Sequence, residues 1–298
     1  MRKSKWTYRL ASVLLVLLST INGFASPQSP DYIIIKSDTI PVYNLILEQY
    51  LQKRETSSQG NLFGLEFRDG ASLNCWRGYQ AIYLVENDSV FLKEIIRCGE
   101  LRSGLPIDQE ASRKRLIDVF GQQVKNRRVH LDWYSGDFNL PKGNLLRWDG
   151  VFHKTFDKET LVQIENGKVK GISEITNYED APDRINRKYG DNISDILFKE
   201  LQKIKWKSTD KFDCSEKYFV TIGKDGKISN VAMVGYESEE EIKAHWDKKE
   251  LNYCLSTLNK RLKGLEFDIV KMNGKPIEET IQIEIWVEDD GKLENWTY

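Results

Sequence analysis

The stretch YFVTIGKDGKISNVAMV, residues 218–234, carries the clearest fold signal in this chain of 298 residues. Apolar residues recur on both sides of Asp225-Gly226, and an Asp-Gly pair supplies the backbone angles of a tight hairpin turn. We therefore expect two antiparallel strands, Tyr218–Ile222 and Ile228–Val234, joined at this turn.

Helices are expected on both sides of this hairpin. Residues 191–206 place their apolar side chains on one face of an amphipathic helix. On the other side, Ser238 can cap a second helix, because Glu241 follows three residues later as in a capping box. Gly264 ends that helix, as glycines commonly do at helix C-termini.

Two more strand-like stretches, 267–271 and 277–287, follow the second helix and flank a turn at Asn273-Gly274. The order helix, two strands, helix and one or two strands is typical of an antiparallel sheet with helices on one face. Residues 191–298 are therefore expected to form an α+β domain with two helices.

The N-terminal half, residues 26–178, is expected to be a mostly β domain with one helix. Asp108 can cap this helix, in which apolar residues recur at helical spacing. Residues 45–51 suggest only a short helical turn. Strands are expected at Tyr32–Ile35, Ile40–Tyr43, Trp76–Val85, Val90–Ile96, Val129–Tyr134, Asn144–Trp148, Thr160–Glu165 and Lys168–Ile175.

A linker is expected between the two halves. Residues 179–190 have no apolar period and contain Pro182 and Gly190, which interrupt regular structure. The whole chain is therefore expected to be an α+β protein with its domain boundary in this segment.

Residues 1–25 have the layout of an export signal. A basic start precedes the apolar run Leu10–Leu18, and Gly23 and Ala25 occupy the small-residue positions before a cleavage point. The run is shorter than the roughly 20 residues that span a bilayer. We therefore expect a cleaved signal peptide and a periplasmic or secreted mature protein, with an uncleaved anchor as the alternative.

Four cysteines lie in the expected mature chain. Cys75 and Cys98 flank a predicted hairpin, so a cross-strand disulfide fits their spacing. Cys214 and Cys254 fall on different expected elements. An exported protein is permitted disulfides, and four buried thiols fit the sequence equally well.

The C-terminal order resembles the C-terminal domain of the TonB family of periplasmic energy transducers. The similarity is carried by residues 218–234, by the acidic start of the helix Glu239–Lys263 and by NGKPIEETIQIEIWV, residues 273–287. A Trp-x-Pro-Gly-like stretch usually precedes the last turn in that family, and here Leu265–Val270 replaces it. The resemblance implies an antiparallel sheet with two helices.

The resemblance also implies a binding mode, because the last strand of the family leaves a sheet edge to which a partner peptide adds. In residues 277–287 the outward side chains would be Thr280, Gln282, Glu284 and Trp286, in alternation with apolar residues. The alternative is an ordinary half-buried strand, protected by its acidic residues against aggregation. Energy transduction itself needs an uncleaved helix and a long proline-rich span, and this chain contains seven prolines.

The N-terminal half resembles uncharacterised secreted proteins from Bacteroidetes. The shared stretches are CWRGYQAIYLVENDSVFL (75–92), WYSGDFNLPKGNLL (133–146) and ETLVQIENGKVK (159–170). This resemblance supports export and implies no particular activity.

Aromatic residues of this half suggest a second class of ligand. Trp76 with Tyr79, and Trp133 with Tyr134, are the candidates for stacking on sugar rings, and core packing is the alternative for all of them. Basic residues gather in the segment 113–128, where anionic glycans or lipid headgroups could bind. A solvated helix face is the favoured reading of that cluster.

Signatures of catalysis are missing from the sequence. His130, His153 and His245 are not spaced as metal ligands, and no phosphate-binding or nucleophile motif occurs. The formal net charge of −1 disfavours a nucleic-acid partner. We therefore expect no enzyme activity, no cofactor, no metal site, and no membrane span after signal cleavage.

Together these features predict a non-enzymatic exported binding or scaffold protein that captures a peptide or envelope protein by strand addition at the C-terminal sheet edge. One alternative is a glycan-binding protein that uses the N-terminal aromatic residues. A second alternative is a TonB-type transport protein, if the N-terminal segment is an uncleaved anchor. The first prediction depends on a free edge beside residues 277–287.

Overall fold

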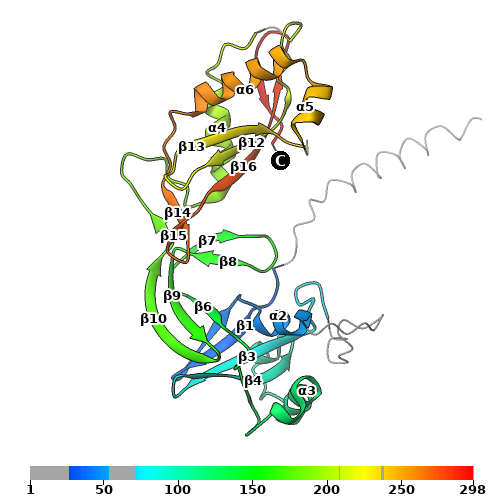
Figure 1. Ribbon diagram of the computed structural model, residues 1–298, viewed down its shortest axis with the longest axis vertical. Helices are drawn as coiled ribbons and strands as arrows, with labels where there is room; N and C mark the ends of the chain where they lie inside the picture. The colour runs from blue at the N-terminus through cyan, green and yellow to red at the C-terminus, as the bar shows by residue number, and fades with distance from the viewer. Residues whose placement is uncertain (1–26, 54–70, 208, 236–237, 298) are drawn as a thin grey trace, which may run out of the picture.

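The computed structural model describes residues 27–53, 71–207, 209–235 and 238–297. This part of the chain is α+β and rich in strands, which confirms the expected fold class at that level. Figure 1 shows a curved molecule, with one lobe built from the N-terminal half and another from the C-terminal half. The expected signal peptide lies outside the described residues. No described helix is long and apolar enough to cross a membrane.

A curled sheet forms the N-terminal lobe. Its strands are β1 (Asp31–Ile35), β2 (Asp38–Val42), β3 (Tyr79–Glu86), β4 (Ser89–Arg97), β5 (Val129–His130), β6 (Gly136–Pro141), β9 (Lys158–Glu165) and β10 (Lys168–Thr176). The strand order is β2-β1-β3-β4-β10-β9-β6, with β5 also paired to β4 and β1 parallel to β3. The end strands β2 and β6 contact each other, so the sheet closes round its core.

Two described helices, α2 (Ile46–Lys53) and α3 (Gln109–Phe120), pack against this sheet. Asp108 caps α3 as expected, because its side chain accepts a 3.0 Å hydrogen bond from the N–H of Ala111. The sequence predicts one helix here, but the expected short turn is a second helix with a buried face. The core contributions of the two helices are Ile46, Leu47, Leu51, Leu116, Val119 and Phe120.

Tight turns close the hairpins of this lobe. The β9–β10 hairpin turns at Asn166-Gly167, where both residues have positive φ angles. The sequence does not predict β6, since that strand begins at Gly136 and ends at Pro141, residues that are rare inside sheets. A separate hairpin is formed by β7 (Leu145–Trp148) and β8 (Lys154–Phe156).

The expected linker is hydrogen-bonded into a small sheet between the lobes. β11 (Tyr178–Glu179) pairs with β14 (Ile269–Met272), which in turn pairs with β15 (Lys275–Pro276). The side chain of Asn177 accepts a 2.9 Å bond from the N–H of Gly274, so the turn expected at this position is held against the end of the N-terminal half, just before the linker. This sheet sits where the two lobes meet in Figure 1.

Buried polar side chains hold this joint together. Arg187 is fully buried and donates to the carbonyl oxygen of Asp268 and to the carboxylate of Glu279. Arg147 of β7 donates two bonds, 2.5 and 3.0 Å long, to the same carboxylate. One carboxylate therefore joins two arginines from different parts of the chain. The linker is held here by polar contacts to residues that lie far away in the sequence. Such contacts leave no apolar period in residues 179–190.

An antiparallel sheet with helices on one face forms the C-terminal lobe. Its elements are α4 (Ile193–Leu201), β12 (Glu216–Ile222), β13 (Ile228–Met233), α5 (Glu239–His245), α6 (Lys248–Leu262), β16 (Glu279–Val287) and β17 (Leu293–Asn295). The strand order is β13-β12-β16-β17, and α4 and α6 pack together on one face. The expected second helix is interrupted at Trp246-Asp247, where Asp247 caps a new helix, α6.

Both cysteine pairs form disulfides. Cys75 and Cys98 join the segment before β3 to the segment after β4, with 6.2 Å between their Cα atoms. Cys214 and Cys254 join the segment before β12 to α6, with a Cα separation of 5.5 Å. The second bridge fixes a helix to the sheet across 40 positions of sequence.

Candidate functional site

The open face of the C-terminal sheet brings together all four side chains expected on the outward face of β16. Thr280, Gln282 and Trp286 are exposed and Glu284 is half-buried, whereas Ile283 and Ile285 between them are buried. The buried set faces α4 and α6. The polar and aromatic set therefore lies on the face that these helices leave uncovered.

An aromatic pair dominates this face. The rings of Trp286 and Trp296 stack with 5.2 Å between centroids, and the two side chains keep 42% and 41% of their surface exposed. Phe219 of β12 lies on the same face and is 37% exposed. Stacked indoles in this position offer a rigid contact surface with a polar N–H at its rim.

Polar contacts fix the strands beneath the aromatic pair. The ammonium of Lys217 lies 3.5 Å from the carboxylate of Glu284, and the hydroxyls of Thr221 and Thr280 lie 3.3 Å apart. Each contact crosses from β12 to β16. The outward side chains are thus partly engaged with one another.

The expected edge is closed over the C-terminal part of β16, because β17 pairs there. Ile285 lies opposite Asn295, and the N–H of Trp296 donates to the carbonyl oxygen of Glu284 at 2.9 Å. The prediction that β16 is the outermost strand is therefore wrong for residues 284–287. The signal for β17 was present in the sequence, since Asp290-Gly291 is another turn pair and Gly291 has a φ of 80°.

The edge is open over the first half of β16. The main chain of Glu284 points away from β12, and alternation along a strand gives Gln282 and Thr280 the same direction. On the side of β16 that faces away from β12, no strand among the described residues pairs with these two positions. Two residues of β16 therefore have outward main-chain groups that no described strand pairs with.

The opposite edge of the sheet is β13. The N–H of Val234 donates to the carbonyl oxygen of Lys217 in β12, so the main chains of Val231 and Met233 point outward. No described strand covers this edge either. It lacks the exposed indoles that stand beside β16.

The N-terminal aromatic residues are mostly core residues. Tyr79 has no exposed surface, its hydroxyl donates to Glu48 at 2.7 Å, and burial raises its pKa well above the ordinary value. It cannot stack on a sugar ring. Trp133 and Tyr134 are half-buried against the core, and only Trp76 of the four keeps a large exposed fraction, 48%.

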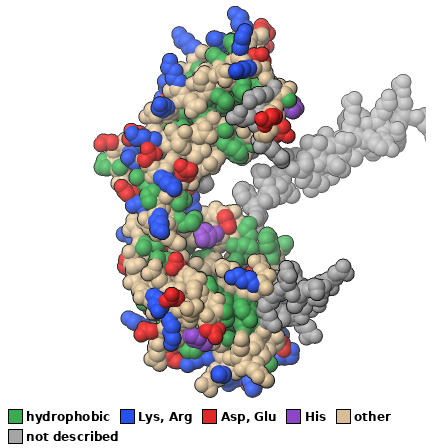
Figure 2. All heavy atoms as spheres, in the orientation of Figure 1, with side chains coloured by type: hydrophobic (Ala, Val, Ile, Leu, Met, Phe, Trp, Pro, Cys, Tyr) green, Lys and Arg blue, Asp and Glu red, His purple; other side chains and the backbone are tan. Residues whose placement is uncertain are grey.

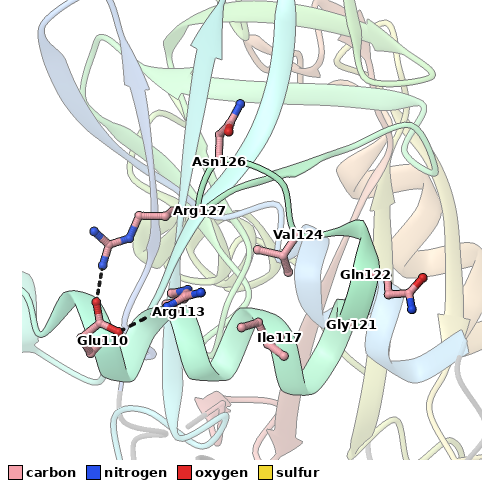
Figure 3. Close-up of a pocket in the computed structure, with 8 residues that line it drawn as sticks. All are labelled: Glu110, Arg113, Ile117, Gly121, Gln122, Val124, Asn126 and Arg127. Carbon is pink, nitrogen blue, oxygen red and sulfur yellow. Dashed lines mark hydrogen bonds and ion pairs between the residues drawn. The ribbon is translucent and has the colours of Figure 1, made fainter.

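The basic cluster borders a hollow of about 720 Å³ beside α3, shown in Figure 3. Glu110 forms ion pairs with Arg127 at 2.6 Å and with Arg113 at 3.7 Å. An anionic ligand would have to compete with this carboxylate for both guanidinium groups. Ile117, which is 43% exposed, also lines the hollow, so the lining is partly apolar.

Metal binding finds no support in the described ranges, where no group of three or more His, Cys, Asp or Glu side chains is placed to hold an ion. The comparisons with known proteins add no relative, since no protein-family model, curated protein or solved structure matches the chain. The similarity to TonB C-terminal domains therefore stays a prediction.

Proposed function

We propose that this protein is a non-enzymatic exported binding or scaffold protein that captures an extended peptide segment by strand addition beside β16. The observation that carries the proposal is the pair of outward main chains at Thr280 and Gln282, at the uncovered edge of a sheet. An added strand gains its affinity from such main-chain groups and its selectivity from neighbouring side chains.

The register of β17 limits where such a strand could lie. Ile285 lies opposite Asn295, so Thr297 lies opposite Ile283. A peptide residue opposite Gln282 would continue the line of β17 beyond Thr297, two strand positions from Trp296 and on the same face of the sheet. Apolar or aromatic side chains at that end of the peptide would contact the indole pair.

The joint between the lobes supports this role because it fixes the start of β16. Glu279, the first residue of the strand, is held by Arg147 and Arg187. Neither edge residue takes part in this network. A preorganised strand gives up less conformational entropy when a partner adds to it.

The test uses Gln282→Pro in the mature protein. Proline removes the outward N–H and is tolerated on an edge strand, so the pairing with β12 is kept. Peptides are selected from a displayed random library on the wild-type protein, and their affinity is measured by calorimetry. We expect Gln282→Pro to weaken the selected peptides about tenfold or more, because main-chain bonds and their alignment are lost.

The matched control is Gln282→Ala, which changes the same side chain but keeps the N–H. It should retain most of the wild-type affinity. Equal binding by the proline and alanine variants would exclude strand addition at β16. If Met233→Pro, rather than Gln282→Pro, lowers the affinity of the selected peptides, the binding edge is β13.

A further inference from the structure

A recess on the N-terminal lobe, between α2 and the β7–β8 hairpin, has the features of a small-molecule site. Its volume is about 320 Å³, at the lower end of the roughly 300–1,000 Å³ usual for such sites. Tyr43 and Phe152 supply its aromatic surface, and Gln49, Gln52 and His153 are among its polar lining residues. Figure 2 shows hydrophobic side chains gathered on the concave side of the molecule, near the tip of this hairpin.

The aromatic wall of the recess is held in place from behind. The ring of Phe152 packs edge-on against Trp76, with 5.7 Å between centroids. Gln28, which is 4% exposed, ties their two loops together. Its N–H donates to the carbonyl oxygen of Val151 at 3.1 Å, and its side-chain oxygen accepts from the N–H of Trp76 at 2.8 Å.

The loop that carries Phe152 and His153 is also fixed by its own turn. The carboxylate of Asp149 accepts 2.8 Å bonds from the N–H groups of Val151 and Phe152. Partial burial alone would raise the pKa of Asp149, but these bonds outweigh it and lower the pKa. The carboxylate is therefore charged at neutral pH, and the loop is formed before any ligand arrives.

The opposite rim contains an unusual backbone conformation. Leu45 has a φ of 49°, in the left-handed region that bulky side chains rarely adopt. Its neighbour Asn44 holds this turn, since its carbonyl oxygen accepts from Gln49 at 2.8 Å and its side-chain oxygen accepts from the N–H of Asn139 at 3.2 Å. Strain that the surrounding structure holds in place is found most often at binding sites.

We propose that this recess binds a neutral saccharide. Flat rings at Tyr43 and Phe152 suit the C–H faces of a sugar, and the amides of Gln49 and Gln52 can donate to and accept from its hydroxyls. No lysine or arginine is among the described lining residues, whereas Glu48 places a carboxylate there. The ammonium of Lys154 lies behind the lining, 5.0 Å from the centroid of the Tyr43 ring, and leaves Phe152 as the main stacking surface. The lining therefore favours a neutral sugar over an anionic one.

The test is a titration of the intact mature protein with a panel of neutral oligosaccharides built from glucose, galactose, mannose and xylose, followed by NMR and calorimetry. The wild type should bind at least one member. Phe152→Ala should weaken that binding about tenfold, the loss expected when a stacking surface is removed. Gln52→Ala, a change at an exposed helix position that leaves the fold intact, should weaken it about threefold.

Tyr189→Ala is the matched control, because its ring is 69% exposed and lies outside the recess. It should bind the sugar as the wild type does. The proposal is overturned if no oligosaccharide binds at millimolar concentration, or if Tyr189→Ala loses as much affinity as Phe152→Ala. Peptide capture is tested separately, since Phe152→Ala should still bind the peptides selected on the C-terminal sheet.

Discussion

Asp157 connects β8 to the segment that joins the two lobes. Its carboxylate accepts a 2.7 Å bond from the ammonium of Lys188 and a 2.8 Å bond from the N–H of Asn144. Burial would raise the pKa of Asp157, but the bond from Lys188 and the bond from Asn144 lower it. The folded protein therefore binds this proton less readily than the unfolded chain does.

Asp157→Asn should accordingly reduce the free energy of unfolding at pH 7 by about 1.5–3 kcal/mol, the usual contribution of a hydrogen bond to a charged group. A depressed pKa stabilises the fold above the unfolded value of about 3.9, and this stabilisation is lost as the pH falls through the folded pKa. Urea unfolding between pH 7 and pH 3 should show the difference between variant and wild type shrinking in acid. Asp183→Asn, at an exposed carboxylate, should show no such trend. If the difference in unfolding free energy between Asp157→Asn and the wild type stays constant with pH, the pKa of Asp157 is not lowered in the folded protein.

The sequence predicts least well which of the single aromatic residues in the candidate sites are exposed to solvent. Trp76 and Tyr79 are three positions apart and look equally suited to a surface. Tyr79 is buried because its ring packs in the core of the lobe, where α2 from another part of the chain also places Glu48 beside its hydroxyl. Alternation along a strand predicts two faces but does not say which face another element will cover.

At the scale of elements, α6 depends on a new N-terminus directly after α5. Asp247 accepts bonds from the N–H groups of Lys249 and Glu250, at 2.9 and 3.2 Å. This cap begins the helix that packs behind the sheet and carries Cys254 of the second disulfide. The break was not expected, because the apolar period continues across it.

Asp247→Ala should lower the free energy of unfolding by about 1 kcal/mol, since two main-chain donors at the start of the helix lose their acceptor. Lys248→Ala, one position further on, removes no cap and serves as the control. Denaturant unfolding followed by circular dichroism gives both values. If the two variants are equally stable, Asp247 does not act as a cap.

Most elements of both sheets follow from local signals, and the exceptions have physical reasons. Hairpins at Asn166-Gly167 and Asp225-Gly226 were predictable because turn residues and strand propensity agree there. The sequence does not predict β17, because the turn pair Asp290-Gly291 is followed by a strand of only three residues, which is too short a pattern to recognise. Its pairing is nonetheless what closes half of the expected edge, so a small element decided the outcome for the site.

At the scale of the whole molecule, Glu279 is the residue on which the two lobes converge. It pairs with Arg147 from the β7–β8 hairpin and with Arg187, whose side chain has no exposed surface. Removing one partner of a buried ion pair leaves the other charge without compensation. Substitution of a residue in this joint should therefore lower the free energy of unfolding more than substitution of an exposed polar residue does.

Glu279→Ala should lower the free energy of unfolding by about 3–5 kcal/mol. The neighbouring exposed residue supplies a matched control, Glu278→Ala, which should change stability by less than about 0.5 kcal/mol. Urea unfolding measures both, and small-angle scattering should show a larger radius of gyration for Glu279→Ala alone. Equal stability of the two variants would mean that the arginine pair does not hold the lobes together.

The two ends of the described chain each lie against a proposed binding surface, which has a practical consequence for anyone preparing the protein. Gln28 supports the aromatic wall of the recess, and the hydroxyl of Thr297 accepts the N–H of Glu284 at 2.8 Å beside the open strand. Affinity tags or immobilisation chemistry attached next to Gln28 or Thr297 would crowd the surfaces under study. A label in an internal surface loop, such as the one at Gly104, would avoid that artefact.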